Sequence, residues 1–107
     1  SSIDAAIGNR DALTGAYGRI EMLPALHDLQ VLTRHGGLPS SIVFMDVDHL
    51  KQINDQHGHP VGDAVLAGVV RHLDLHLRTQ DKVFRYGGDE FLVALSGAPV
   101  RMDLRCR

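Results

Sequence analysis

The chain of 107 residues has no tryptophan, two tyrosines, three phenylalanines and a single cysteine, Cys106. One cysteine excludes an internal disulfide and fits a reducing compartment. No apolar run approaches the ~18 residues that a membrane-spanning helix needs, and the N-terminus lacks the layout of a signal peptide. We therefore expect a soluble, cytoplasmic chain that makes no direct membrane contact.

The chain also has no large excess of positive or negative charge. The net charge is -2 at pH 7, which is too small to indicate a nucleic-acid partner. Apolar residues make up 44% of the chain, as in ordinary soluble domains. A chain of this size buries roughly 60–70% of its unfolded surface, which is enough for one modest core. The composition therefore predicts a single domain. Seven histidines are many for this length, so metal binding has to be considered.

The apolar pattern predicts a helix, a strand, two further helices and a hairpin. Apolar residues recur at spacings of three and four over 19–35 and 62–77, which indicates amphipathic helices, and 51–56 is expected to form a short helix. Because proline is tolerated only near the first turn of a helix, Pro24 allows this helix to start later than Arg19.

The strands are predicted from continuous apolar runs. Residues 41–48 form the most apolar run and predict a central strand that is buried on both faces. Residues 82–86 and 90–96 read as two strands joined by a tight hairpin. We expect an α/β fold of the α+β type, with an antiparallel central sheet on which the helices pack.

The hairpin turn contains the most informative stretch of the chain, Arg85-Tyr86-Gly87-Gly88-Asp89-Glu90-Phe91. The two glycines are expected to allow positive φ angles and a close approach of a large ligand. An acidic pair on a hairpin tip, here Asp89 and Glu90, can offer a divalent cation to a phosphate. Gly-Gly-Asp is also ordinary turn chemistry, so the turn alone does not decide between the two interpretations.

Two more carboxylates close the strand predicted at 41–48. Asp46 is the better ligand candidate, because beside Asp89 and Glu90 it would give the convergent oxygen ligands that Mg²⁺ prefers. Asp48 is expected to point the opposite way and to cap the following helix.

The histidines have alternative interpretations. His57 and His59 could bind zinc, but matching cysteines are missing. His72 and His76, four residues apart on one helix, could chelate a metal adventitiously, and exposure on the polar face of that helix is the preferred interpretation.

Four motifs occur in a specific order and spacing: Asp11 to Gly15, Asp46 to Asp55, His57 to Asp63 and Arg85 to Phe91. Together they resemble the GGDEF family of diguanylate cyclases. The resemblance implies a fold like the polymerase palm and the nucleotide cyclases. It covers residues 11–96, preceded at 1–10 by the end of a possible connecting helix and followed at 97–107 by a tail that does not match.

The family activity implied by the resemblance is the condensation of two GTP molecules into cyclic di-GMP and pyrophosphate. Asp46, Asp89 and the carbonyl of Val47 would hold Mg²⁺, with Mn²⁺ as a substitute. Asp89, or Glu90 beside it, would help to deprotonate the attacking ribose 3′-hydroxyl. Lys51 would neutralise triphosphate charge in the transition state. On its own, Lys51 could equally be a solvated surface lysine.

The resemblance also implies the contacts that bind GTP. The side chains of Asn54 and Asp63 would recognise guanine, and His59 would line the pocket. The amides of His49 and Leu50 would bind phosphate oxygens. Gly87 and Gly88 would let the ligand approach the turn closely. Read alone, Asn54 is a residue of a helix end or turn.

A product-inhibition site is implied by Arg78-Thr79-Gln80-Asp81, because Asp81 stands six residues before Gly87, as in the family. Arg78 would pair with a guanine edge or a phosphate of cyclic di-GMP, and Asp81 with guanine amines. An Arg-x-x-Asp sequence is common by chance, so its position carries the argument.

Partners follow from the same resemblance. Each domain would present one GTP, so catalysis would need a homodimer, controlled by an upstream sensor domain. The alternative is a catalytically impaired module that binds GTP or cyclic di-GMP as a sensor. The family domain continues beyond the hairpin. We therefore expect this chain to expose apolar surface and a strand edge, to self-associate or be weakly stable, and to bind GTP weakly.

Overall fold

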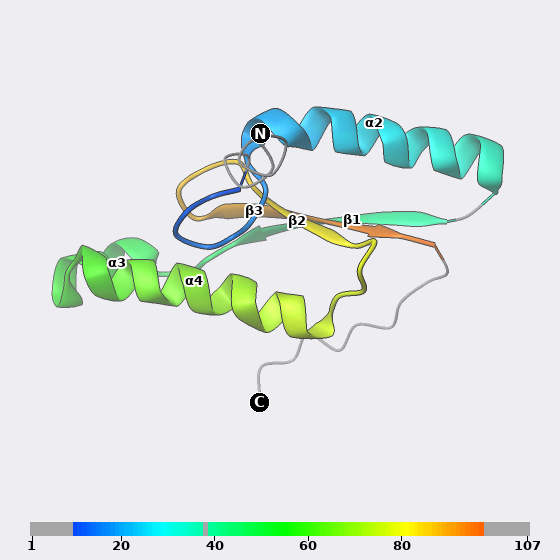
Figure 1. The fold of residues 1–107 in the computed structure, drawn as a ribbon. Helices are drawn as coiled ribbons and strands as arrows, with labels where there is room; N and C mark the ends of the chain where they lie inside the picture. The colour runs from blue at the N-terminus through cyan, green and yellow to red at the C-terminus, as the bar shows by residue number, and fades with distance from the viewer. Residues whose placement is uncertain (1–9, 38, 98–107) are drawn as a thin grey trace, which may run out of the picture.

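The computed structural model describes residues 10–37 and 39–97, and the expected connecting helix (1–10) and tail (97–107) lie outside these residues apart from Arg10 and Gly97. The elements are α2 (Arg19–Gly36), β1 (Ser40–Asp46), α3 (Leu50–His57), α4 (His59–His76), β2 (Lys82–Arg85) and β3 (Glu90–Ser96). The predicted order of a helix, a strand, two helices and a hairpin is confirmed. Figure 1 shows the sheet as a middle layer, with α2 on one face and α4 on the other.

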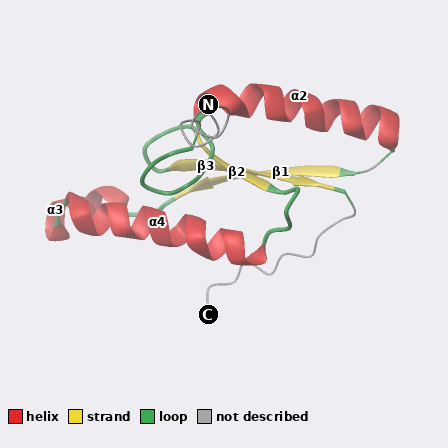
Figure 2. Ribbon diagram, viewed as in Figure 1, coloured by secondary structure: helices red, strands yellow, loops and turns green. Residues whose placement is uncertain are grey.

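The three described strands form one antiparallel sheet in the order β1-β3-β2. Figure 2 shows them as the yellow layer between the helices. Along the β1–β3 pair, Ser40 lies opposite Ser96 and Asp46 lies opposite Glu90. The pair therefore brings the last residue of β1 to the first residue of β3, at the hairpin end of the sheet.

The prediction that the strand at 41–48 is central and buried on both faces is wrong for the described sheet. β3 is central, and β1 lies at an edge and ends at Asp46. All five residues from Phe91 to Leu95 are buried, whereas on β1 Ile42 and Phe44 are 47% and 67% exposed. The uninterrupted apolar run on β3, residues 91–95, is one residue longer than the run on β1, residues 42–45, so the sequence did not support ranking β1 first.

Two hydrophobic clusters share the sheet because successive strand residues point to opposite faces. On the α4 face, Phe91, Val93 and Leu95 pack with Leu66 and other residues of α4. On the α2 face the cluster contains Phe84, Leu92, Ala94 and Leu29, with Met22, Ala25 and Leu26 packed against it. The expectation that the two long helices cover the sheet is confirmed.

Helix α2 begins at Arg19 with Pro24 inside it, so the later start allowed by the sequence is not observed. The backbone N–H of Gly18 donates to the Glu21 carboxylate (3.1 Å), which satisfies one group at the helix start. Pro24 removes a bond to the carbonyl of Ile20, a residue that is mostly exposed, so water can satisfy that carbonyl. Helices α3 and α4 are each slightly longer than predicted.

No helix within the described ranges is long and apolar enough to cross a membrane.

The burial of the aromatic side chains predicts which of them stabilise the fold. Phe84→Ala should lower the free energy of unfolding by about 3–5 kcal/mol, because Phe84 is 0% exposed in the α2-face cluster. Phe44→Ala, on the exposed side of β1, should cost less than about 1 kcal/mol. Urea denaturation followed by circular dichroism measures both, and equal losses would contradict the observed packing.

Candidate functional site

Three carboxylate residues meet where the β1–β3 pair ends. Asp46 is paired with Glu90, and the backbone N–H of Val47 donates to the carbonyl of Asp89 (3.0 Å). A cleft of about 440 Å³ lies at this end of the sheet, lined by residues 46–52, 89 and 90. The predicted convergence of the strand end and the hairpin on one cleft is therefore observed.

The carboxylates also lie near one phenol, that of Tyr86. Desolvation raises the pKa of Tyr86, and the negative charges of Glu90, Asp46 and Asp89 raise it further. The Tyr86 ring meets Phe44 edge to face, with 6.1 Å between ring centroids. The hairpin tip and the end of β1 thus form one acidic surface beside an aromatic pair.

The donor set at this cleft fits a hard divalent cation. Four carboxylate residues, Asp46, Asp48, Asp89 and Glu90, line it together with Val47, and Mg²⁺ takes one or two carboxylates with phosphate oxygens and water. Within residues 10–37 and 39–97, no three His, Cys, Asp or Glu side chains are grouped closely enough to hold a metal alone. An ion here would therefore depend on oxygens from a ligand.

The two glycines of the turn do not take positive φ angles, so that part of the prediction is wrong, while the expected close approach of a ligand stays a prediction. A Cβ at Gly87 would come within 2.5 Å of Glu90 Oε1 and 3.2 Å of Glu90 Cβ, whereas a Cβ at Gly88 would meet nothing within 4 Å. The Glu90 side chain occupies the space beside Gly87, so a side chain at position 87 would require Glu90 to move.

Arg85 holds the turn, a role that the sequence analysis did not assign. Its Nε and Nη2 donate to the carbonyl of Gly88 (3.2 and 2.8 Å), and its Nη1 donates to Asp11 Oδ2 (3.0 Å). Burial alone would raise the pKa of Asp11, but hydrogen bonds from Thr14 and Arg85 lower it overall. The turn at residues 11–15 is thereby tied to the hairpin. The sequence signal for this role was the position of Arg85, a cation directly before a turn whose backbone carbonyls need hydrogen-bond donors.

The loop from β1 to α3 corrects one prediction. His49, with φ 64°, is the N-cap of α3, and no side chain caps this helix, so Asp48 does not do so. Asp48 lies in the turn before the helix and lines the cleft. The amides of His49 and Leu50 stand at the helix start without a side-chain acceptor, and Lys51 follows with an exposed side chain.

The residues expected to read guanine lie at the α3–α4 junction, outside the wall of the acidic cleft. Asn54 is on α3, and its Oδ1 is buried without a hydrogen-bond partner. His59 and Asp63 are exposed on the first turns of α4. Asn54 packs against the buried Gly62 of α4.

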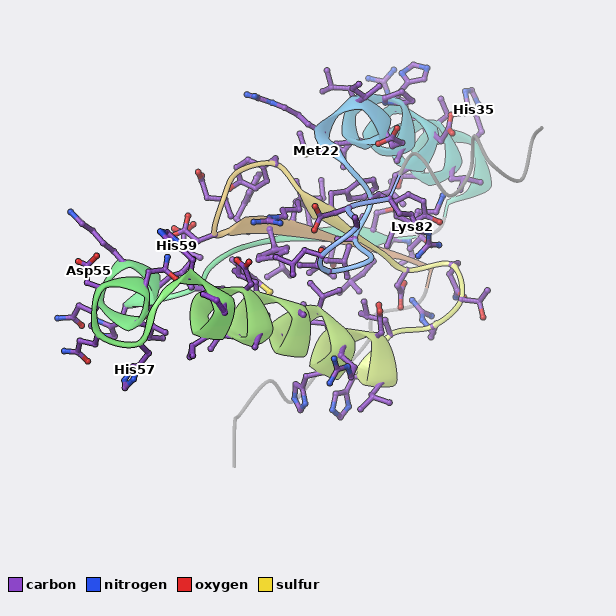
Figure 3. All side chains as sticks on the ribbon, turned by 60° about the vertical axis from the view of Figure 1, so that its left-hand side comes forward. Met22, His35, Asp55, His57, His59 and Lys82 are labelled. Carbon is purple, nitrogen blue, oxygen red and sulfur yellow. The ribbon has the colours of Figure 1, made fainter. Side chains whose placement is uncertain are left out.

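Neither of the two histidine pairs is arranged as a metal site. His57 and His59 flank Gly58 and point away from each other in Figure 3. His72 and His76 are exposed on α4, with ring centroids 4.8 Å apart, as the preferred interpretation expected.

Arg78 and Asp81 form an internal ion pair. Asp81, 8% exposed, accepts hydrogen bonds from the backbone N–H groups of Arg78 (2.9 Å) and Ser96 (3.3 Å) and from the Arg78 guanidinium (3.2 and 3.3 Å). Burial alone would raise the pKa of Asp81, but these hydrogen bonds hold it below its usual value. The pair joins the end of α4 to the end of β3.

A second hollow, of about 340 Å³, adjoins this ion pair. Its lining includes the cations Arg10, Arg78 and Lys82 and the ring of Tyr17. The Arg10 guanidinium lies over that ring, 4.3 Å from its centroid. The sequence analysis missed Arg10, Tyr17 and Lys82, because Lys82 is 65 residues from Tyr17 and meets it only in the fold.

A comparison with protein families identifies the family to which this chain belongs. The family described as "Diguanylate cyclase, GGDEF domain" matches residues 8–106. This chain belongs to the GGDEF family. The matched range extends into both segments that the sequence analysis placed outside the domain.

GGDEF proteins with similar sequences include two from well-known bacteria. The chain is 38% identical to the probable diguanylate cyclase DgcC of Escherichia coli over 93 residues, which is 87% of this chain and 25% of that protein. It is also 38% identical to the response regulator PleD of Caulobacter vibrioides over 95 residues, or 89% of this chain and 21% of PleD. The chain thus spans about a quarter or less of these relatives.

Solved GGDEF structures share the palm-like α+β fold. A microbial GGDEF domain described for a novel interaction mode with cyclic di-GMP has a TM-score of 0.78 at 38% identity, covering 81% of this chain and 57% of that one. A sensory box/GGDEF protein from Caulobacter crescentus has a TM-score of 0.80 at 32% identity, covering 87% and 60%.

The depressed pKa of Asp81 predicts a pH-dependent stability. A lowered folded-state pKa contributes stability that is present above the unfolded value, about 3.9, and is lost as the pH falls through the folded value. Asp81→Asn should therefore melt well below the wild type at pH 7, and the gap should narrow as the pH falls below about 4. Thermal melts across pH 2.5–8 measure this; those end points are about 1.5 units below and 4 units above the unfolded value.

The control is Asp28→Asn, an exposed position on α2, which should follow the wild-type curve. A gap between Asp81→Asn and the wild type that stays constant with pH would show that the carboxylate charge does not stabilise the fold.

Proposed function

We propose that this chain is part of a diguanylate cyclase domain that condenses two GTP molecules into cyclic di-GMP and pyrophosphate with a divalent metal. The observation that supports this most is the β1–β3 register, which brings Asp46, Asp89 and Glu90 to one cleft beside the start of α3. This places acidic groups next to helix-start amides, the two features that a metal-bound triphosphate requires.

The proposed roles follow from chemistry and position. Asp46, Asp89 and the carbonyl of Val47 would hold Mg²⁺, or Mn²⁺ in its place, which when bound neutralises phosphate charge. The amides of His49 and Leu50 would bind phosphate oxygens, and Lys51 would offset charge on the triphosphate. All of these residues line the same cleft.

Each of the two condensation steps forms one bond and breaks one. The ribose 3′-oxygen of one GTP bonds to the α-phosphorus of the other, and the bond from that phosphorus to pyrophosphate breaks. The hydroxyl proton passes to Glu90 or Asp89. The Glu90 carboxylate, folded against Gly87, is held at the tip of the hairpin where the attacking ribose would enter.

Two nucleotides are needed, and the chain has one such cleft among its described residues. We propose a homodimer in which two clefts face each other, with an upstream sensor domain controlling their approach. Asn54, Asp63 and His59 at the α3–α4 junction would bind the guanine base, beyond the phosphate-binding part of the cleft.

Turnover tests the proposed function. The chain incubated with GTP and Mg²⁺ should form cyclic di-GMP, detected by chromatography. Asp89→Ala should reduce the rate by at least a hundredfold, because it removes both a metal ligand and a proton acceptor. Asp28→Asn should leave the rate unchanged. Product formation that survives Asp89→Ala would contradict the assignment of the cleft.

A second candidate function is binding of cyclic di-GMP without turnover, and the hollow beside Arg78, lined by three cations and by Asp74 and Asp81, favours it. Arg78 keeps part of its side chain exposed, and Arg10 and Lys82 add positive charge around Tyr17. Asp81 already accepts four hydrogen bonds within the chain, so the arginine is the more available of the two motif residues. Cations and an aromatic ring suit a guanine nucleotide with phosphates.

Calorimetric titration with cyclic di-GMP tests this hollow. Arg78→Ala should weaken binding roughly tenfold, the effect of one charge-assisted hydrogen bond. Arg71→Ala, an exposed arginine on α4, is the matched control. Tight binding without turnover would identify a sensor module, and equal affinities of the two variants would exclude the hollow as the binding site.

A further inference from the structure

Gly62, the fourth residue of α4, is buried where α4 meets α3. A Cβ at this position would lie 1.7 Å from Asn54 Oδ1 and 2.8 Å from Asn54 Cγ. The φ angle of Gly62 is not positive, so its backbone conformation does not require glycine. Space is the reason for glycine here, because the carboxamide of Asn54 occupies the place of the missing side chain.

Asn54, the residue that contacts Gly62, lacks a hydrogen bond at its side-chain oxygen. Asn54 Oδ1 is buried and has no hydrogen-bond partner. A buried carbonyl oxygen without a donor is unfavourable, so an apolar side chain would stabilise this junction better. Packing at this junction therefore gives no reason for an amide at position 54. Its donor end, Nδ2, lies farther from Gly62 than the oxygen does, at 3.5 Å from the Cβ position.

We propose that Gly62 is a positioning residue for base recognition: its missing side chain forms the slot that holds the Asn54 carboxamide between α3 and α4, in the orientation that reads guanine. This inference rests on the proposed function. With Oδ1 in the slot, Nδ2 can donate to a ring acceptor of the base. Asp63, the next residue of α4, can accept from the guanine N1–H and amine.

The chain provides a matched control at Gly68, six residues further along α4. A Cβ at Gly68 would meet nothing within 4 Å, and its φ is not positive either. Alanine is a better helix former than glycine at both positions. Any loss that Gly62→Ala causes and Gly68→Ala does not must come from the contact with Asn54.

Thermal melting tests the slot itself, without any ligand. Gly62→Ala should lower the melting temperature by several degrees, whereas Gly68→Ala should raise it slightly. Asn54→Ala should rescue Gly62→Ala, because the clashing atoms are then gone, and the double variant should melt near the single Asn54→Ala variant. If Gly62→Ala melts like the wild type, or if removing Asn54 gives no rescue, the inference is overturned.

Nucleotide binding tests the consequence for recognition. In calorimetric titrations with Mg²⁺, the wild type should bind GTP more tightly than ATP. Gly62→Ala should lose roughly tenfold of this preference with ATP affinity unchanged, and Asn54→Ala and the double variant should lose the same amount. A wild type without preference would overturn the proposed function, whereas a preference kept in Gly62→Ala would overturn this inference alone.

Discussion

The antiparallel pairing of β1 with β3 is the constraint on which the rest of the structure depends. Its register sets Asp46 opposite Glu90 and brings Val47 to the carbonyl of Asp89. A slip of one residue would move every β1 side chain to the other face of the sheet. Val43 and Met45 would then leave the cluster beneath α4, so the hydrophobic core fixes the register and the register fixes the acidic site.

Partly buried polar contacts fix the loops around the sheet. Arg85 ties the hairpin turn to Asp11, and the Arg78–Asp81 pair ties the end of α4 to the end of β3. In each pair the arginine also donates to a backbone carbonyl, Gly88 for Arg85 and Ser96 for Arg78, so each pair joins two segments of the chain. Both ends of the sheet are therefore tied to neighbouring segments of the chain.

Much of the fold could be predicted from local patterns. The helices α2 and α4 and the hairpin follow from apolar spacing, and the motifs pointed to Asp46 and Asp89. Features that depend on contacts between elements could not be predicted. Strand order was one, because both strands carry apolar runs and their order depends on which strands pair in the fold. The roles of Gly87 and Gly62 could not be predicted either, because the side chains that lie against them, those of Glu90 and Asn54, reach them only in the fold. Asp48 matched a capping pattern, yet His49 takes the N-cap position.

Paramagnetic relaxation by Mn²⁺ in the presence of GTP tests the central claim that the β1–β3 register creates the metal–nucleotide site. In an NMR spectrum of the ¹⁵N-labelled chain, the account predicts selective broadening of amide signals from residues 46–50 and 88–90. Signals at the far end of the same strands, around Ser40 and Ser96, should stay sharp. Broadening centred on the Arg78 hollow or on His72 and His76, with the hairpin unaffected, would contradict it.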